Sequence, residues 1–461
     1  MATFSIENFG CRATEADAAA LRGRLLASGL ELVEEHARAN VVVLNTCTVT
    51  AAADSQAREA VRKIHRANPG AHIVLTGCYA QRAPDELAAL EGVALVVGNS
   101  HQTEIPGLVS QLAAPFALGH PTAGGFVSLA ELQGNAMSLA RGPAKILTGD
   151  IFEQTDISIA PSEISVADRT RPILKIQDGC NNRCSYCVIP FVRGRSRSLT
   201  PEAVIGETRK LVASGANEIV LSGINLGSYG RDLEPKARLA SVVERILSET
   251  ALDQIRFSSI EPQDVTEDFV ALVASSPRIA PHFHVPLQSG SNRILRAMRR
   301  WYRAEHYAER VQVIHRHLPD AAIGADVITG FPGETEQDFE DTCEIIQRLP
   351  FTYLHVFSFS QRPGTEAWKL RDLVRPEVIR ERARRLRGLA QEKAAAFRAA
   401  QAGRCVRALM LARGGADWTE ALTGNYLKVR VPGRWPANQW RLVCVDAAAP
   451  ETAQVSANSR R

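Results

Sequence analysis

The first part of the chain alternates short apolar runs with segments of helical periodicity. Three apolar runs predict buried strands: Val41–Leu44, Ile73–Leu75 and Ala94–Val96. Apolar residues recur at helical spacing over Ala16–Ser28 and Ala52–Arg66, and Asn68-Pro69-Gly70 predicts the end of the second helix. Because strands alternating with helices are typical of a parallel sheet, we expect an N-terminal parallel α/β sheet domain over residues 1–112.

A second alternation begins near Arg171, after an Ala-, Gly- and Ser-rich stretch that predicts a linker at residues 113–168. Six strands are predicted: Ile173–Ile176, Glu218–Leu221, Gln254–Ser258, His282–Val285, Ile323–Ile328 and Tyr353–Phe357. Each is followed by a helical pattern, and the repeat of roughly 30 to 45 residues suits βα units. We therefore expect a central partial (βα)6 barrel at residues 169–400, with functional residues at the C-terminal ends of its strands.

The last part of the chain predicts a small β-barrel. A helical stretch at Arg375–Ala400 leads to three predicted strands: Cys405–Leu411, Tyr426–Val431 and Trp440–Val445. We place this β-module at residues 401–447 and a disordered tail at residues 448–461. Basic residues outnumber acidic ones in the module: Arg404, Arg407, Arg413, Lys428, Arg430, Arg434 and Arg441 against Asp417, Glu420 and Asp446. Such a surface either binds nucleic acid or is simply solvated.

Composition narrows the class of protein only slightly. The 461 residues are 45% hydrophobic and 23% charged, which excludes a disordered, collagenous or coiled-coil chain. The net charge of +4 indicates nothing by itself. No apolar stretch is long enough to span a membrane, and the N-terminus lacks the pattern of a secretory signal. The expectation is a cytoplasmic protein that does not enter a membrane.

The nine cysteines are the main clue to chemistry, because six of them form two sets of three. Cys180, Cys184 and Cys187 make a C-x3-C-x2-C motif directly after a predicted strand. A structural zinc site usually has four protein ligands, and neither flank of the motif supplies a fourth. In a cubane 4Fe-4S cluster, three cysteines leave one iron open to a substrate or cofactor. The alternative is three core cysteines that share this spacing by chance.

Cys11, Cys47 and Cys78 are far apart in sequence, but each lies just beyond an expected strand end: Cys11 after Phe4–Phe9, Cys47 after Val41–Leu44 and Cys78 after Ile73–Leu75. The carboxyl ends of parallel strands lie on one edge of a sheet, so these thiols could converge in a crevice. Spacing and position alone leave the alternative open that they are small buried core residues. The other three cysteines, Cys343, Cys405 and Cys444, are interpreted as structural.

The C-x3-C-x2-C motif, with an aromatic residue before its last cysteine, resembles the signature of radical S-adenosylmethionine (SAM) enzymes. The resemblance implies that Cys180, Cys184 and Cys187 hold a 4Fe-4S cluster whose open iron binds SAM, the source of a 5'-deoxyadenosyl radical. Glycine-rich segments at the strand exits, each an ordinary turn when taken alone, fit a SAM-binding barrel end. The candidate cofactor-binding residues are Tyr186, Ser222, Gly223, Asn225, Glu261, Gln288, Asp326 and Arg362.

Three short sequence motifs around these cysteines resemble the N-terminal domain of methylthiotransferases. They are Phe9-Gly10-Cys11, Asn45–Thr50 and Thr76–Gln81. The resemblance runs from about Phe4 to Val445. It implies that Cys11, Cys47 and Cys78 bind a second, auxiliary 4Fe-4S cluster, where sulfur is methylated and from which it is inserted. It also implies that the C-terminal β-module corresponds to a tRNA-binding TRAM domain.

Short sequence motifs also resemble those of one branch of that family. Asn45–Thr50 with Arg58, and Ile260-Glu261-Pro262, are similar to the branch that acts on threonylcarbamoyladenosine in tRNA, whereas Arg12-Ala13-Thr14 departs from it. The resemblance thus implies methylthiolation of C2 of N(6)-threonylcarbamoyladenosine beside the anticodon, with two SAM molecules consumed per product. A reducing protein such as flavodoxin or ferredoxin and a sulfur donor would be partners. The alternatives are isopentenyladenosine in tRNA, an aspartate of a ribosomal protein, or an iron-sulfur redox sensor that binds RNA without turnover.

Arginines cluster after the cysteine motif and after the fourth barrel strand. The two groups are Arg193, Arg195 and Arg197, then Arg293, Arg296, Arg299, Arg300 and Arg303. They are candidates for phosphate contact, although charge runs are usually solvated helix faces. Arg362, after the last barrel strand, is a stronger candidate for a carboxylate or phosphate, because a guanidinium binds either group bidentately.

Overall fold

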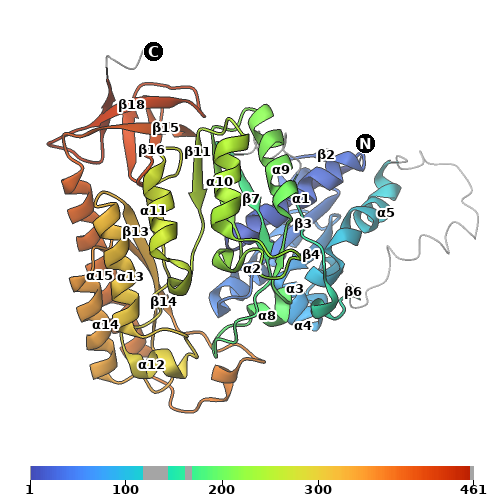
Figure 1. Cartoon of the computed structure of the whole chain (residues 1–461). Coiled ribbons are helices and arrows are strands. Elements are labelled where there is room, and N and C mark those ends of the chain that lie inside the picture. Colours follow the sequence, from blue (N-terminus) through green and yellow to red (C-terminus); the bar gives the residue numbers. More distant parts are fainter. Residues whose placement is uncertain (1, 118–143, 161–168, 457–461) are drawn as a thin grey trace, which may run out of the picture. The chain divides into compact units, whose positions relative to one another are not determined.

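The computed structural model describes residues 2–117, 144–160 and 169–456, and these form two compact units (Figure 1). The first unit comprises Met1–Pro161 with Val188–Arg195, and the second comprises Ser162–Cys187 with Ser196–Arg461. The predicted domain boundaries stay predictions. Part of the predicted linker at 113–168 lies outside the described residues, and its described part is grouped with the first unit.

The first unit contains a six-stranded sheet in the order β2-β1-β3-β4-β5-β6, and all its strand pairs are parallel. The strands are β1 (Thr3–Asn8), β2 (Glu31–Leu32), β3 (Val41–Thr46), β4 (His72–Gly77), β5 (Val93–Gly98) and β6 (Lys145–Leu147). This confirms the predicted N-terminal parallel α/β sheet. The strand β6 was not predicted, because it lies in the segment interpreted as a linker.

Helices cover both faces of this sheet. They are α1 (Arg12–Ala27), α2 (Ala51–Ala67), α3 (Cys78–Arg82), α4 (Pro84–Ala88), α5 (Ile105–Ala117), α8 (Ile189–Arg193) and the 3-10 turns η1 (His36–Arg38), η2 (Asn99–Glu104) and η4 (Ile151–Glu153). Successive residues of β3 pack into different cores: Val42 and Leu44 into one, Val41 and Val43 into the other. Burial on both faces explains why the strands are continuous apolar runs rather than alternating patterns.

The second unit contains the six predicted barrel strands, all parallel. They are β7 (Ile173–Lys175), β10 (Glu218–Ser222), β11 (Gln254–Phe257), β12 (His282–His284), β13 (Ala322–Thr329) and β14 (Tyr353–Ser358). Two three-stranded sheets, β11-β10-β7 and β12-β13-β14, are joined by bridges between Ile255 and Ile279 and between Ser259 and His284. A short hairpin of β8 (Gln177–Asp178) and β9 (Arg197–Ser198) lies beside them. The partial (βα)6 barrel is confirmed.

Helices follow the barrel strands, and Figure 1 shows α13, α14 and α15 along β13 and β14. The helices are α9 (Pro201–Ala213), α10 (Leu239–Glu249), α11 (Glu267–Ser275), α12 (Asn292–Ala297), α13 (Ala304–His317), α14 (Glu336–Arg348) and α15 (Pro376–Ala400), with the turns η5 (Leu226–Ser228), η6 (Pro262–Asp264) and η7 (Glu366–Lys369). Hydroxyl side chains cap several of them: Thr335 accepts from the backbone N–H of Asp338, whose carboxylate accepts in return. Such a capping box satisfies donors that the first helical turn leaves unpaired.

The C-terminal part forms a five-stranded antiparallel sheet in the order β17-β16-β15-β18-β19. Its strands are β15 (Cys405–Gly414), β16 (Trp418–Thr423), β17 (Lys428–Pro432), β18 (Trp440–Val445) and β19 (Ala453–Val455). A bridge between Arg430 and Thr452 brings the two edges together, which confirms the small β-barrel. The prediction missed β16, and it wrongly placed β19 in a disordered tail because the flanking Ala- and Pro-rich residues resemble one. Residues 457–461 of that tail lie outside the described residues.

The β-module packs on the barrel through a buried arginine. Arg256 on β11 is fully buried and lies 2.7 Å from Glu218 on β10. It also donates hydrogen bonds to the carbonyls of Thr423 and Gly424 in the module, at 3.2 and 2.9 Å. These bonds satisfy a charge that would be costly to bury alone.

The three cysteines that were interpreted as structural lie in different settings. Cys405 and Cys444 face each other in the β15–β18 register and form a disulfide, whereas Cys343 is a buried free thiol. Among the described residues, none of the helices is both long enough and apolar enough to cross a lipid bilayer.

Candidate active site

The C-x3-C-x2-C motif begins where β8 ends, and buried polar side chains brace its first residues. Lys175 lies 2.7 Å from the Asp178 carboxylate, and the backbone N–H of Gly179 donates to the same carboxylate at 2.8 Å. Gln177 donates to the Gly179 carbonyl at 2.8 Å. Gly179 has a φ of 69°, a left-handed conformation that favours glycine. The chain is therefore turned and held rigidly directly before Cys180.

Cys180 lies beside Asn225, one of the predicted cofactor-binding residues. Its sulfur accepts a hydrogen bond from the backbone N–H of Asn182 at 3.4 Å. Burial raises the pKa of the Cys180 thiol to about 11, while hydrogen bonds from Asn182 and the Asn225 side chain act to lower it. Asn225 is positioned in turn by Gln177, whose side-chain oxygen accepts its backbone N–H at 2.8 Å. The exit of β10 thus reaches the cysteine loop.

Cys184 contacts a buried arginine, Arg300, which the sequence analysis named only as one of five candidates for phosphate contact. Arg300 donates a hydrogen bond to the Cys184 sulfur at 3.3 Å and forms an ion pair with Glu261. The two charged side chains are 4% and 18% exposed. Burial raises the pKa of Glu261, and Arg300 opposes that rise. Glu261, predicted to bind cofactor, therefore lies next to the cysteine loop with Arg300 between them.

Ser185 and Tyr186 anchor the middle of the loop. The backbone N–H of Ser185 donates to the Met298 carbonyl at 3.0 Å, and its carbonyl accepts from Ala367 at 2.7 Å. Tyr186 packs against the buried apolar side chains of Ile294, Met298, Phe331 and Ala367. Its aromatic ring therefore fixes the loop on the barrel end, a packing role that adds to the predicted one.

Three more predicted residues lie at strand exits. Ser222 is buried at the end of β10, and the next residue, Gly223, donates its backbone N–H to the Ser258 hydroxyl at 3.3 Å. A Cβ atom on Gly223 would lie 2.8 Å from the Gln177 side-chain oxygen, so a larger residue there would force Gln177 to shift. Gln288 has a φ of 67° and donates its backbone N–H to the Asp326 carbonyl at 2.8 Å.

Asp326 belongs to a polar network formed by β12, β13 and β14. Its carboxylate lies 3.0 Å from Nε2 of His284 and 3.2 Å from Nδ1 of His355. The second ring nitrogen of His284 lies 3.1 Å from the Tyr353 hydroxyl. Burial acts to raise the pKa of Asp326, but hydrogen bonds from the two histidines hold it well below its usual range. The donor atoms of the three residues lie within 4.8 Å of one another, a spacing that a divalent cation could also use.

Arg362 is buried after β14. Its Nε donates to the Gln361 carbonyl at 2.9 Å, and its own carbonyl accepts from the Thr365 hydroxyl at 2.7 Å. These bonds hold the turn that follows the last barrel strand. The predicted bidentate binding of a carboxylate or phosphate stays a prediction.

The first unit brings Cys11, Cys47 and Cys78 together at one edge of its sheet. Cys47 directly follows β3, Cys78 directly follows β4, and Cys11 precedes α1. Burial, together with the nearby Cys78 and Cys11 thiols, raises the pKa of Cys47 to about 12. Gly10 permits this approach: its φ is 125°, and a Cβ atom there would lie 2.6 Å from the Cys47 Cβ.

A buried ion pair stands beside these thiols. Arg193 on α8 lies 2.7 Å from Asp17 on α1, and the two side chains are 3% and 1% exposed. Burial raises the pKa of the Cys78 thiol, while the positive charge and a hydrogen bond from Arg193 lower it. Asn99 lies 3.7 Å from the Cys78 sulfur and donates to the Val192 carbonyl at 2.8 Å.

Both sets of thiols have the chemistry that iron-sulfur ligands need. None of the six sulfurs is in a disulfide, and three of them lie in each unit. Each set lies beside a guanidinium, which compensates the negative charge of metal-bound thiolates and donates a hydrogen bond to sulfur. The residues therefore fit one three-cysteine cluster in each unit.

Comparisons with known proteins agree with this geometry. The model of the radical SAM superfamily matches residues 174–346, and that of the uncharacterized protein family UPF0004 matches residues 3–98. A radical S-adenosylmethionine methyltransferase from Kitasatospora setae, solved with cobalamin and a [4Fe-4S] cluster, has a similar fold. Its TM-score is 0.55 at 17% identity, with 80% of this chain and 77% of that chain covered. Fold and motif thus define a radical SAM protein.

Curated relatives narrow the class. The threonylcarbamoyladenosine tRNA methylthiotransferase of Aquifex aeolicus is 36% identical over 93% of this chain and 96% of its own length. The enzyme of the same name from Bacillus subtilis is 36% identical over 86% of this chain and 81% of its own. A tRNA-2-methylthio-N(6)-dimethylallyladenosine synthase from Thermobifida fusca is 34% identical over 83% and 73%. The chain belongs to the tRNA methylthiotransferase family of radical SAM enzymes.

Proposed function

We propose that this protein methylthiolates C2 of N(6)-threonylcarbamoyladenosine beside the anticodon of tRNA, using two 4Fe-4S clusters and two SAM molecules per product. The observation that carries the substrate is the relative from Aquifex aeolicus, which is named for threonylcarbamoyladenosine and aligns with nearly the whole chain. Relatives named for dimethylallyladenosine are less identical, at 31 to 34%, although one from Acidothermus cellulolyticus aligns with 95% of this chain. The geometry of two separate cysteine sets supports the two-cluster count.

Each group of residues has a distinct task in this proposal. Cys180, Cys184 and Cys187 hold the cluster that binds SAM, and Cys11, Cys47 and Cys78 hold the auxiliary cluster. When bound, the SAM-binding cluster supplies an electron that generates a carbon radical, which can remove hydrogen from a C–H bond that no protein base could ionise. Asn225 and Glu261, at strand exits, and Arg300, after α12, order the cysteine loop.

The remaining predicted cofactor residues line the same barrel end in this proposal. Ser222, Gly223 and Gln288 offer backbone groups at strand exits, and Tyr186 fixes the loop. Asp326, with His284 and His355, forms a polar wall that suits the amino-acid tail of the modified adenosine, because that tail carries both donors and acceptors. Arg362 is the proposed partner of a carboxylate or phosphate.

The C-terminal β-module is the proposed TRAM-like surface for tRNA. Three arginines lie over tryptophan rings there: Arg407 over Trp440, Arg430 over Trp418 and Arg441 over Trp435. Paired cations and aromatic faces are typical of surfaces that bind RNA backbones and bases. Flavodoxin or ferredoxin as reductant, a separate sulfur donor and a cytoplasmic location complete the proposal.

A competition assay tests the substrate. Purified protein with reconstituted clusters is given equal amounts of tRNA carrying threonylcarbamoyladenosine and tRNA carrying isopentenyladenosine, with SAM, a reductant and sulfide. We expect 2-methylthio-threonylcarbamoyladenosine as the main product by nucleoside mass spectrometry. Product only from the isopentenyl substrate would contradict the proposal, and SAM cleavage without either product would leave the radical chemistry but remove both substrates.

A further inference from the structure

Two of the five tryptophans of the chain have exposed rings, and both are in the second unit. Trp301 is 75% exposed and Trp368 is 47% exposed. Neither ring makes a ring, cation or hydrogen-bond contact with any residue that the structure describes, whereas the other three tryptophans each lie under an arginine. Large aromatic rings left in solvent mark binding surfaces when they gather at one place.

Both tryptophans are tied to the C-x3-C-x2-C loop. The carbonyl of Met298, three residues before Trp301, accepts the backbone N–H of Ser185 at 3.0 Å. The backbone N–H of Ala367, directly before Trp368, donates to the Ser185 carbonyl at 2.7 Å. The segments that carry Trp301 and Trp368 are therefore both hydrogen-bonded to the backbone of Ser185, one through its N–H and the other through its carbonyl.

The backbone next to Trp301 is held in a conformation that is unusual for its residue. Arg299 has a φ of 56°, and hydrogen bonds from Arg299 to Arg296 and from Arg300 to Leu295, at 3.0 and 2.9 Å, hold the turn. The turn sends neighbouring side chains in different directions. Arg300, 4% exposed, reaches Cys184, while the ring of Trp301 lies in solvent. Left-handed residues other than glycine gather at functional sites.

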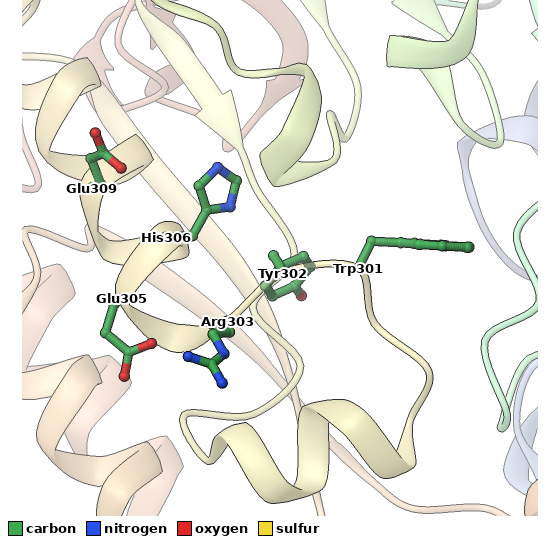
Figure 2. Close-up of a pocket in the computed structure, with 6 residues that line it drawn as sticks. All are labelled: Trp301, Tyr302, Arg303, Glu305, His306 and Glu309. Carbon is green, nitrogen blue, oxygen red and sulfur yellow. The ribbon is translucent and has the colours of Figure 1, made fainter.

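The charge around Trp301 suits RNA. Residues 293–303 contain five arginines and no acidic residue, and Arg296, Arg299 and Arg303 are exposed. Figure 2 shows the indole extending away from the helix that carries Glu305 and Glu309. Trp301 and both glutamates line an open pocket of about 640 Å³. Arginines attract phosphates, whereas the carboxylates that line the pocket accept hydrogen bonds from the amino groups of bases. A stacking face, cations and acceptors together are what a single-stranded RNA segment requires.

We propose that Trp301 and Trp368 are stacking platforms for unpaired bases that flank the reacting nucleotide of the RNA substrate. The inference rests on the proposed tRNA function. A base that reacts inside a protein must leave the stack of its own strand, so its neighbours lose a stacking partner. The indoles at the rim of the cysteine loop replace that partner and hold the strand with the reacting base beside Cys184.

Binding of RNA to the cluster-loaded protein tests the proposal. The probe is a fluorescently labelled anticodon stem-loop carrying threonylcarbamoyladenosine, and binding is followed by fluorescence anisotropy. Trp301→Leu and Trp368→Leu keep an apolar side chain but remove the ring, whereas Trp301→Phe and Trp368→Phe keep a ring. We expect each Leu variant to weaken binding by about 5- to 150-fold, and each Phe variant to lose much less. Leu373→Ala, at a 52% exposed apolar position, is the control and should bind as the wild type does.

Iron content and SAM cleavage without RNA separate a platform from a structural role, because both should stay at wild-type values in the Leu variants. Equal binding by the Leu and Phe variants, or loss of iron with the loss of binding, would overturn the proposal. A wild type that binds RNA through these rings but makes no methylthiolated product would remove the proposed function and leave the platforms in place. A wild type that does not bind the RNA would remove both.

Discussion

Cys180, Cys184 and Cys187 occupy one short loop, whereas Cys11, Cys47 and Cys78 come from the ends of different strands, 36 and 31 positions apart in sequence. The first set is brought together by local chain geometry, with Gly179 turning the backbone. The second set meets only because parallel strands end on one edge of a sheet. Three thiols can thus be brought together either by close spacing in one loop or by the topology of a parallel sheet.

The surroundings of the two sets are nevertheless alike. Each lies beside a buried arginine that is paired with a carboxylate: Arg300 with Glu261 in the second unit, and Arg193 with Asp17 in the first. In each case the guanidinium also hydrogen-bonds a cysteine sulfur. The common requirement is a fixed positive charge where thiolates hold metal.

The largest expected effect is the loss of chemistry when a cysteine is removed. Cys184→Ala should abolish SAM cleavage and product formation, whereas Cys47→Ala should abolish methylthiolation and leave some SAM cleavage. Each variant should retain about four of the eight iron atoms that two cubane clusters hold. Chromatography of 5'-deoxyadenosine and iron analysis measure both properties. Equal SAM cleavage by both variants would show that the two sets do not have the separate roles assigned to them.

The next effect is on thiol reactivity in the cluster-free protein. The pKa of Cys47 is raised from 9.0 to about 12, so its reactive thiolate is about a thousandfold scarcer below pH 9 than in an ordinary thiol. Alkylation of Cys47 by iodoacetamide should therefore be slow at pH 8 and should rise about tenfold per pH unit up to about pH 11. Peptide mass spectrometry gives the rate for each cysteine, with the exposed Cys11 as the internal comparison. A rate at Cys47 that levels off near pH 9 would contradict the assigned burial.

Removing either arginine should leave a carboxylate buried without its partner. Arg193→Met and Arg300→Met should each reduce local stability by about 3–5 kcal/mol, with the larger loss for Arg193 because its pair is more deeply buried. Hydrogen exchange of α1 and α12, followed by mass spectrometry, reports the two regions separately. The double variant Arg193→Met with Asp17→Leu should recover much of the stability. No recovery would mean that the arginine acts by packing rather than by charge.

The smallest expected effect is that of replacing Gly179 or Gly10, the glycines next to the two sets of cysteines, by alanine. Gly179→Ala places alanine in a left-handed conformation, at a cost of about 1–2 kcal/mol, and should leave the iron content unchanged. Gly10→Ala adds a Cβ 2.6 Å from that of Cys47, so we expect it to reduce the iron held by the first unit as well. Iron analysis of the two variants checks the difference. Normal iron content in Gly10→Ala would contradict this expectation, because it would show that Cys47 can move away from the added Cβ atom and still bind iron with Cys11 and Cys78.

The sequence predicted those features of the fold that depend on periodicity and on punctuation by glycine and proline. The six barrel strands and the N-terminal sheet follow from apolar runs, and both are confirmed. The strands β2, β6, β8, β9, β16 and β19 were missed. The strands β6 and β19 are only three residues long, and β6 pairs with β5, whose residues lie 50 positions earlier in the chain. Pairing of this kind depends on tertiary packing rather than on propensity.

Some site residues could likewise be recognised from the sequence, whereas others are brought to the site only by the fold. Cys180, Cys184 and Cys187 stand out by spacing, and Glu261 and Asn225 by their positions at strand exits. Arg300 could not be distinguished from four neighbouring arginines, because only the left-handed turn at Arg299 directs it inward. His284 and His355 are 71 positions apart, and only the adjacency of β12, β13 and β14 brings them to Asp326.

The central claim is that this chain uses its clusters to methylthiolate threonylcarbamoyladenosine in tRNA. The most direct test supplies the intact protein or Cys184→Ala to cells that lack the modification, followed by nucleoside mass spectrometry of their tRNA. The account expects 2-methylthio-threonylcarbamoyladenosine only with the intact protein. If neither protein yields it while the intact protein still cleaves SAM, the substrate assignment is wrong; if both yield it, the role of the C-x3-C-x2-C loop is wrong.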